Sequence, residues 1–283
     1  MKQTLQILTL LLTSFNLFGQ TTYTGFIDKY PIELATEVDV FSDGDGHARG
    51  VYAYSNHNTP IRVNGELKQG TLTLFEKDEQ GNNKATLTFE NFDENSQQLE
   101  GIWKDLTSNK QYKIRLTKNF GLDLIQSVSL KDKYFRLVVD GPSRFFSRVT
   151  GVKILDKKTN KLIQNIDLDC QFLGFDNISV GDYNFDGIED FSVFEDSYAG
   201  PNTSSRYFLF DPKTNEYFDS NFDGTSLEFD SNAKRIYEHN QCCAGRYRMH
   251  TEYEVINNEM VLIEQTCLEY DETTDDYKTV ECE

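Results

Sequence analysis

Residues 70–92, GTLTLFEKDEQGNNKATLTFENF, decide the fold class of this chain. Both halves of the stretch alternate with a period of two: Leu72 and Leu74 share one face with Glu76 next in the same row, while Phe75 belongs to the opposite face. This alternation is typical of half-buried antiparallel strands. The intervening EQGNNK has turn-forming residues at a hairpin length, so the stretch predicts a β-hairpin.

Similar short strands surround this hairpin on both sides. An up-and-down series of strands must close or pack in order to hide its edges. We therefore predict that residues 21–119 form a small β-barrel or sandwich module. The other predicted strands of the module are GVYAYS, PIRVNGEL, LEGIWKD and YKIRLTK.

The composition changes near residue 120, where a second strand-rich unit begins. Hairpin turns are predicted at KKTNK, DPKTNE and NNE. The chain has only five Pro and no long Ser/Gly tract, which argues against a flexible linker. We expect an all-β protein in which the unit 120–283 contacts the unit 21–119.

Residues 1–20 have the layout of a secretory signal peptide. Lys2 precedes an apolar run over residues 5–18, and the small Gly19 offers a cleavage point. A buried core helix is the alternative, but nothing later in the chain is helical enough to pack on it. No other stretch reaches ~18 apolar residues. We predict an exported protein of the periplasm or the extracellular space, without membrane insertion.

The chain is strongly acidic, with 28 Lys and Arg against 46 Asp and Glu and a net charge of −18. Such a chain repels nucleic acid and anionic membrane surfaces, and it attracts basic partners and divalent cations. Solubility alone is the alternative explanation of the charge.

The five cysteines all lie at or after residue 170. In an oxidising compartment they favour one or two disulfides with one thiol left over, and their connectivity stays open. Because neighbouring cysteines bridge each other only with strain, the adjacent pair is expected to bond elsewhere. Zinc is disfavoured, since no C-x2-C pair occurs. The cysteines are Cys170, Cys242, Cys243, Cys267 and Cys282.

The stretch VGDYNFDGIEDFSVFE, residues 180–195, contains the most specific motif. Calcium takes six to eight oxygens in a compact loop, and short Asp and Asn side chains supply them at alternate positions. Counting the first aspartate as position 1, the loop fills positions 3, 5 and 9 with side-chain oxygens and position 7 with a backbone carbonyl. The predicted ligands are Asp182, Asn184, Asp186, Ile188 and Asp190.

The residues around these ligands distinguish the loop from an EF-hand. Gly187 at position 6 permits the sharp turn, but Val193 stands at position 12, where an EF-hand has a bidentate Glu. The flanking residues are β-branched or aromatic, so the loop is expected to join strands. Magnesium, an empty loop and a solvent-exposed acidic turn are the alternatives.

A weaker copy of the motif occupies residues 219–230. Its ninth position is Leu227, which supplies no side-chain oxygen, so a plain turn with an acidic rim competes with a second metal site. The residues that repeat the pattern are Asp219, Asn221, Asp223, Gly224 and Asp230.

The loop GDYNFDGIED resembles the FG-GAP type of calcium loop. With NFDGIEDF, SYAGPNTSSRYFLFDPKTNEYF and CCAG, the chain over residues 120–265 resembles exported bacterial proteins related to the periplasmic immunity protein of a xanthomonad type IV secretion effector. The resemblance implies a calcium-binding, β-propeller-like domain that inhibits a lysozyme-like peptidoglycan glycosidase. The full loop pattern occurs once, which argues against a regular multi-blade propeller. Residues 23–118 resemble a small β module that recurs in exported bacterial proteins.

The loop SYAGPNTSSR is predicted to be stiffened at its base by the metal. Aromatic side chains on such a loop are good anchors for a partner. Tyr198, Pro201 and Tyr207 are therefore the predicted partner contacts, with local packing as the alternative.

No catalytic residues are predicted, because none of the four His lies in a known catalytic or phosphate-binding motif. The chain is expected to be a non-enzymatic, exported, calcium-binding protein, and a basic lysozyme-like glycosidase is the candidate partner. The alternatives are a calcium-stabilised envelope scaffold or adhesion-type module and a hydrolase with an unrecognised pair of carboxylates.

Overall fold

The computed structural model describes residues 20–121, 123–140 and 147–282. Nearly all of its regular structure is antiparallel β-strand; a short 3-10 turn, η1 (Cys243–Gly245), is the one helical element in the described ranges. The chain is therefore all-β, as the sequence predicts. Residues 1–19 of the predicted signal peptide lie outside the described ranges.

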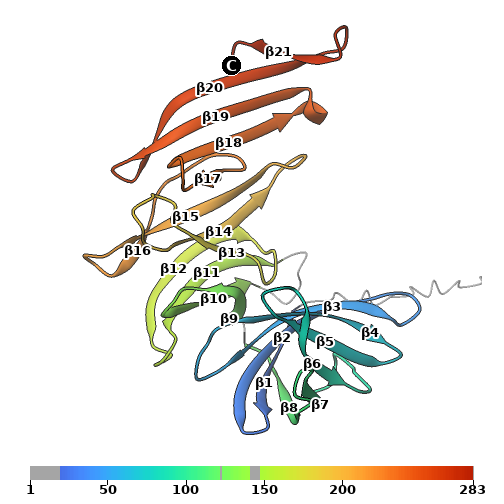
Figure 1. Ribbon diagram of the computed structural model, residues 1–283. Helices are drawn as coiled ribbons and strands as arrows, with labels where there is room; N and C mark the ends of the chain where they lie inside the picture. Colours follow the sequence, from blue (N-terminus) through green and yellow to red (C-terminus); the bar gives the residue numbers. More distant parts are fainter. Residues whose placement is uncertain (1–19, 122, 141–146, 283) are drawn as a thin grey trace, which may run out of the picture.

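Eight strands close into an N-terminal barrel (Figure 1). Each strand pairs antiparallel with the next, and the eighth pairs back onto the first. Of the two predicted forms, barrel and sandwich, the barrel is confirmed. The strands are β1 (Thr21–Ile27), β2 (Tyr30–Val40), β3 (Gly46–Tyr54), β4 (Ile61–Lys68), β5 (Thr71–Lys77), β6 (Asn83–Phe89), β7 (Gln98–Asp105) and β8 (Gln111–Asn119).

The hairpin of β5 and β6 contributes a row of buried side chains to the interior of the barrel. Leu72 and Leu74 are fully buried, and Glu76 follows them in the same buried row. A buried carboxylate is costly unless it is hydrogen-bonded. Glu76 accepts a hydrogen bond from the Tyr52 hydroxyl at 2.6 Å and another from Lys84 Nζ at 3.0 Å. These hydrogen bonds offset the cost of burying the carboxylate in the barrel.

Glycine permits close approach of neighbouring strands in the barrel wall. A Cβ atom on Gly25 would lie 2.0 Å from the carbonyl oxygen of Arg115, and one on Gly65 would lie 1.9 Å from that of Thr73. Only glycine fits at such positions without displacing the neighbouring backbone.

Three further sheets follow the barrel in chain order (Figure 1). In each sheet, strands that are consecutive in sequence are neighbours. The first sheet contains β9 (Asp123–Ser129), β10 (Lys133–Asp140), β11 (Arg148–Asp156) and β12 (Leu162–Gln171); the middle sheet contains β13 (Ile178–Gly181), β14 (Asp190–Ser197), β15 (Thr203–Asp211) and β16 (Glu216–Asp219); the last sheet contains β17 (Glu228–Asp230), β18 (Arg235–Cys242), β19 (Tyr247–Ile256), β20 (Glu259–Asp271) and β21 (Asp276–Val280).

The barrel is fixed to the first sheet by apolar and ionic contacts. Ala35 and Val51 of the barrel pack in one buried cluster with Ile125 of β9. Beside them, Arg136 of β10 forms a bidentate ion pair with Glu33 of β2, and both side chains are mostly buried. The two units therefore touch, as the absence of a flexible linker suggests.

The first and middle sheets share the largest core of the second unit. Phe191 of β14 is fully buried, with its ring stacked on Phe208 at 4.9 Å between centroids and 5.0 Å from Phe135 of the first sheet. Burial of rings of this size is a major source of stabilisation.

The middle and last sheets meet in a separate aromatic cluster. Tyr183, in the loop between β13 and β14, and Tyr207 of β15 contact Phe229 of β17 at centroid distances of 4.7 and 5.0 Å. The fully buried Ile236 of β18 belongs to the same cluster. We call this contact region the seam.

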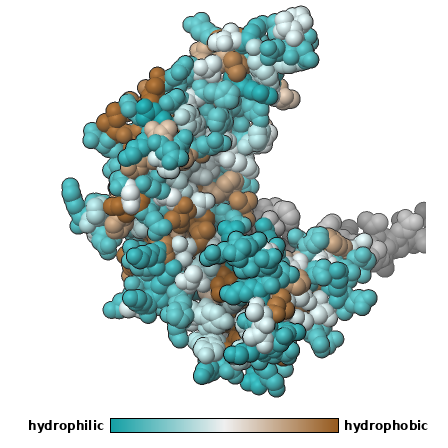
Figure 2. Space-filling view, viewed as in Figure 1, coloured by the Kyte–Doolittle hydropathy of each residue, from teal (hydrophilic) through white to brown (hydrophobic). Residues whose placement is uncertain are grey.

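The units form a curved stack, with the barrel at one end and the last sheet at the other (Figures 1 and 2). In the view of Figure 2, hydrophilic residues cover most of the barrel and the last sheet, and hydrophobic residues gather along the middle of the stack. No helix in the described ranges is both long and apolar enough to span a membrane.

Candidate metal centre

The metal loop, residues 182–190, connects two paired strands of the middle sheet. Gly181 at the end of β13 pairs with Asp190 at the start of β14, and Ile178 pairs with Val193. The prediction that strands rather than helices flank the loop is confirmed. Because Val193 lies inside β14 and is fully buried, position 12 is part of the sheet.

The loop folds around the carboxylates of its own short side chains. Asp182 accepts hydrogen bonds from the backbone amides of Asp186 at 3.0 Å and Gly187 at 2.8 Å. Asp186 accepts one from the amide of Ile188 at 2.8 Å. Gly187 adopts a φ of +89°, which residues with a side chain rarely reach, so glycine is required at this point of the turn.

Asp190 is the last residue of the metal loop, and its side chain is fully buried. Its two carboxylate oxygens accept hydrogen bonds from the amides of Tyr183 and of Phe210 on β15, both at 2.9 Å. Burial, together with the nearby carboxylates of Asp186 and Asp182, raises the pKa of Asp190 to about 6, although the hydrogen bonds from the amides of Phe210 and Tyr183 lower it. This site thus combines concentrated negative charge with a buried carboxyl group.

The donor types of the loop fit a hard cation, since carboxylate, amide and carbonyl oxygens are the ligands that calcium prefers. Their arrangement is that of a self-bonded turn: in the described ranges, no three Asp, Glu, His or Cys side chains are gathered as a metal site requires. The raised pKa of Asp190 is the observation that favours a cation here. Burial and the neighbouring carboxylates oppose the ionisation of this carboxyl group, and a bound cation would offset both.

Two contacts from the last sheet reach the metal loop across the seam. The Asn184 side chain donates to Asn258 Oδ1 at 3.0 Å, and Lys234 Nζ donates to the carbonyl of Phe185 at 3.2 Å. Asn258 and Lys234 both lie in turns between strands. Turn residues so distant in the chain carry no local signal of their meeting, so these two contacts were not predicted from the sequence.

The loop SYAGPNTSSR does not have the metal loop at its base, which corrects the prediction that the metal stiffens it. Its turn, residues 198–202, which we call the tip loop, follows the far end of β14. This strand has eight residues. At ~3.3 Å per residue, it separates the tip loop from the metal loop by roughly 25 Å. A metal at residues 182–190 would therefore sit at the opposite end of the strand.

The last sheet holds the tip loop instead. Asn202 donates to Asn240 Oδ1 at 2.9 Å and to the carbonyl of Gln241 at 2.8 Å, and its own Oδ1 accepts from the Gln241 amide at 3.2 Å. The tip loop is therefore held by hydrogen bonds of the Asn202 side chain to the last sheet, and not by the metal loop.

Of the three predicted partner contacts, Tyr198 and Pro201 are exposed, and Tyr198 is 53% exposed. Tyr207 is wrong as a partner contact, because its ring is buried in the seam against Tyr183 and Phe229. Both faces of the middle sheet are covered, so alternate residues of β15 do not reach solvent.

The weaker copy of the motif at residues 219–230 does not assemble a site. Asp219 is ion-paired with Arg206, and Asp230 accepts hydrogen bonds from the amides of its own turn, at Asn232 and Ala233. Phe222 points into the seam cluster rather than outward. The competing interpretation, a plain acidic turn, describes this stretch.

The cysteines divide into three environments. Cys267 and Cys282 form a disulfide between β20 and the segment after β21. Cys170 is buried in the core shared by the first and middle sheets. Cys242 and Cys243 are exposed, with their sulfur atoms 2.9 Å apart, so the expectation that this pair bonds to Cys170, Cys267 or Cys282 is wrong.

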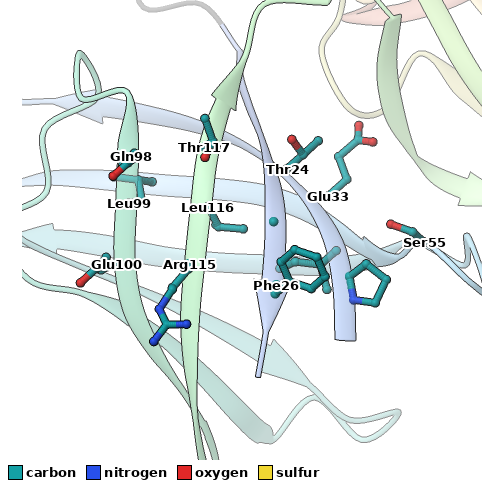
Figure 3. A pocket seen from close by; sticks show the side chains of 13 residues that line it. Thr24, Phe26, Glu33, Ser55, Gln98, Leu99, Glu100, Arg115, Leu116 and Thr117 are labelled. Atoms are coloured by element: carbon teal, nitrogen blue, oxygen red, sulfur yellow. The ribbon is translucent and has the colours of Figure 1, made fainter. Parts of the chain in front are cut away.

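A shallow pocket of about 590 Å³ lies on the barrel wall (Figure 3). Glu33 and Glu100 both line it; Glu33 is ion-paired with Arg136, and Glu100 of β7 lies opposite Arg115 of β8 in the strand register. The Glu33 carboxylate in this pocket is therefore already engaged in the contact between the barrel and the first sheet. Its other labelled side chains are Thr24, Phe26, Ser55, Gln98, Leu99, Leu116 and Thr117.

No protein-family model matches the chain, and no curated protein matches it. Among solved structures, the chain is similar to a Xanthomonas type IV secretion system related protein, with 13% identity and a TM-score of 0.28 over 93% of this chain and 99% of the other. It is also similar to the β-propeller domain of the Trilobed protease from Pyrococcus furiosus, with 11% identity and a TM-score of 0.24 over 94% and 85%. A third similarity is to a porin-like protein from Bacteroides uniformis, with 9% identity and a TM-score of 0.18 over 93% and 98%.

Proposed function

We propose that this chain is an exported, non-enzymatic binding protein in which a calcium ion at the metal loop stabilises the seam between two propeller-like sheets. The observation that carries the proposal is the buried Asp190 carboxyl, whose pKa is raised by burial and by the charges of Asp186 and Asp182. A divalent cation would stabilise a group of carboxylates whose ionisation is opposed by burial and by mutual repulsion.

The residues that would hold the ion are those predicted from the spacing: Asp182, Asn184, Asp186, Asp190 and the carbonyl of Ile188. The chain's own contacts explain what binding would stabilise. Asn184 bonds to Asn258 and the carbonyl of Phe185 bonds to Lys234, so an ordered metal loop also orders two turns of the last sheet. On this proposal the calcium is structural.

Calorimetric titration with calcium tests the metal. We expect the wild-type protein to bind one ion, and Asp186→Ala to lose binding by at least ~100-fold, the effect of removing a charged ligand. Asp211→Ala is the matched control, because Asp211 caps the amide of Lys213 in a turn outside the loop. Unchanged binding in Asp186→Ala, or no binding in the wild type, would refute the assignment.

The partner that best suits the surface is a basic protein, and we propose a cationic lysozyme-like glycosidase. The net charge of −18 would steer such a protein toward this chain. Tyr198 and Pro201 offer an exposed anchor on a loop that Asn202 fixes to the last sheet. A rigid aromatic anchor of this kind is typical of interface hot spots.

An inhibition assay with a cationic lysozyme tests the partner separately from the metal. We expect the wild-type protein to slow the hydrolysis of peptidoglycan, and Tyr198→Ala to weaken this inhibition at least ~30-fold, equivalent to ~2 kcal/mol. Phe120→Ala removes an aromatic ring of 71% exposure away from the tip loop and should change nothing. Hydrolysis of peptidoglycan by this chain alone would contradict the proposal and favour an enzyme.

A further inference from the structure

The adjacent Cys242 and Cys243 lie on the rim of a second pocket, of about 580 Å³, at the end of the last sheet. Tyr247, Met249 and the Cys267 half of the disulfide line the same pocket. None of these side chains belongs to the metal loop, and Asn240 and Gln241, which hold the tip loop, line the same pocket.

The two thiols approach each other closely for non-bonded sulfur atoms. Their Sγ atoms are 2.9 Å apart, whereas a disulfide bond is about 2.05 Å long. Both cysteines are exposed, and neither is near a different cysteine that could compete: Cys170 is buried in another core, and Cys267 is already bonded. The remaining partner for each thiol is the other.

The backbone holds this pair in place. Cys243, Ala244 and Gly245 have consecutive positive φ values of 56°, 57° and 84°. The Tyr277 hydroxyl donates to the carbonyl of Gly245 at 2.6 Å, and the Arg246 amide donates to the carbonyl of Cys243 at 3.2 Å. The turn that juxtaposes the thiols is therefore fixed by contacts made outside the thiols themselves.

We propose that Cys242 and Cys243 are a site of reversible oxidation, where a small-molecule or protein disulfide converts the two thiols into a vicinal disulfide. One cysteine thiolate attacks a sulfur of the oxidant, forms a mixed disulfide and releases the first thiolate. The neighbouring cysteine then attacks the cysteine sulfur of that mixed disulfide and expels the second. Two electrons pass to the oxidant, whose two sulfurs leave as thiols carrying the two protons from the cysteines.

The bond formed in this way is more easily reduced than an ordinary disulfide. Adjacent Cα atoms are held about 3.8 Å apart by the peptide bond, whereas disulfides usually join Cα atoms about 4.4–6.8 Å apart. In contrast, the Cα atoms of Cys267 and Cys282 are 5.3 Å apart, within the usual range. Reducing agents should therefore open the vicinal bond first and leave the other bond intact.

Peptide mass spectrometry after thiol alkylation tests the proposal on the full chain. The protein is equilibrated with oxidised glutathione, quenched in acid, alkylated under denaturing conditions and digested. We expect the peptide with Cys242 and Cys243 to carry neither an alkyl group nor glutathione and to be lighter than the free dithiol by two hydrogens. Addition of a low concentration of dithiothreitol should restore both alkylation sites while the Cys267–Cys282 linkage persists.

Two variants separate this site from general thiol reactivity. Cys242→Ser should leave Cys243 either alkylated or joined to glutathione, because the ring can no longer close. Cys170→Ala, which removes the other free thiol, should leave the oxidation of the pair unchanged. The proposal is overturned if the wild-type pair stays alkylated in oxidised glutathione, if both cysteines carry glutathione, or if either is cross-linked to Cys170, Cys267 or Cys282.

Discussion

The pH dependence of stability at Asp190 is the sharpest test of the metal loop. Its carboxyl is fully buried, and burial raises its pKa from the ordinary 3.8 to about 6. Between these two values the folded state binds more protons than the unfolded state. The contribution of Asp190 to the free energy of unfolding is therefore largest below the lower value, and it falls as the pH rises through 6.

The size of the effect follows from the shift. About two pKa units at ~1.36 kcal/mol each give close to 3 kcal/mol in full, of which about 2 kcal/mol is gained by pH ~4, where the carboxyl of the unfolded chain is still partly ionised. The perturbation is Asp190→Asn, compared with wild type by urea unfolding in chelator at a series of pH values. The variant leaves one of the amides of Tyr183 and Phe210 without an acceptor at every pH, so that loss is a constant offset.

In chelator we expect the wild type to gain about 2 kcal/mol relative to Asp190→Asn between pH ~7 and pH ~4. With calcium at ~100 times its dissociation constant, the ion should add about 2.7 kcal/mol to the wild type at neutral pH, and acid should remove this gain because protons compete for the carboxylate. A difference that stays constant with pH in chelator would refute the pKa argument. The same pH profile with and without calcium would exclude Asp190 as a ligand.

Three further substitutions test the packing by urea unfolding. Tyr52→Phe removes the hydroxyl that donates to the buried Glu76, and should cost about 1.5–3 kcal/mol; a loss below ~0.5 kcal/mol would show that this hydrogen bond does not matter. Arg136→Ala leaves Glu33 unpaired between the barrel and the first sheet and should cost about 2–4 kcal/mol, of which the double variant with Glu33→Ala should recover part; no recovery would argue against a charge effect. Phe191→Ala opens a cavity between the first and middle sheets and should cost about 3–5 kcal/mol, so a neutral result would mean that this core is not tightly packed.

The barrel could be predicted because its signals are local. In β5 the period of two places Leu72, Leu74 and Glu76 inside, and the turn residues after them set the register of β6. The strands on either side of the metal loop were predictable for the same reason, since β-branched and aromatic residues flank an Asp- and Gly-rich turn.

The period of two fails where a sheet is covered on both faces. In β15 the consecutive residues Tyr207, Phe208 and Leu209 are all buried, because neighbouring sheets cover both sides. Such a strand gives no sign of which residues reach solvent. Tyr207 was therefore misassigned as a partner contact, while Tyr198 lies beyond the strand.

Contacts between sheets could not be predicted from local patterns. Asn184 meets Asn258 from 74 positions away, and Asn202 meets Gln241 from 39 positions away. All four are ordinary turn or strand-end residues when taken alone. The juxtaposition of Cys242 and Cys243 depends likewise on Tyr277, which fixes their turn from a different strand.

The order of the apolar clusters along the stack governs how the molecule can come apart. One cluster joins the barrel to the first sheet, another joins the first sheet to the middle sheet, and the seam joins the middle sheet to the last. Linear arrays with nearest-neighbour contacts open from their ends, so amide hydrogen exchange should be fastest in the last sheet and slowest around Phe191. Fraying of the last sheet would release Asn202 and Asn184 from their partners together, so the tip loop and the metal loop would lose order as one cooperative unit although they lie at opposite ends of β14.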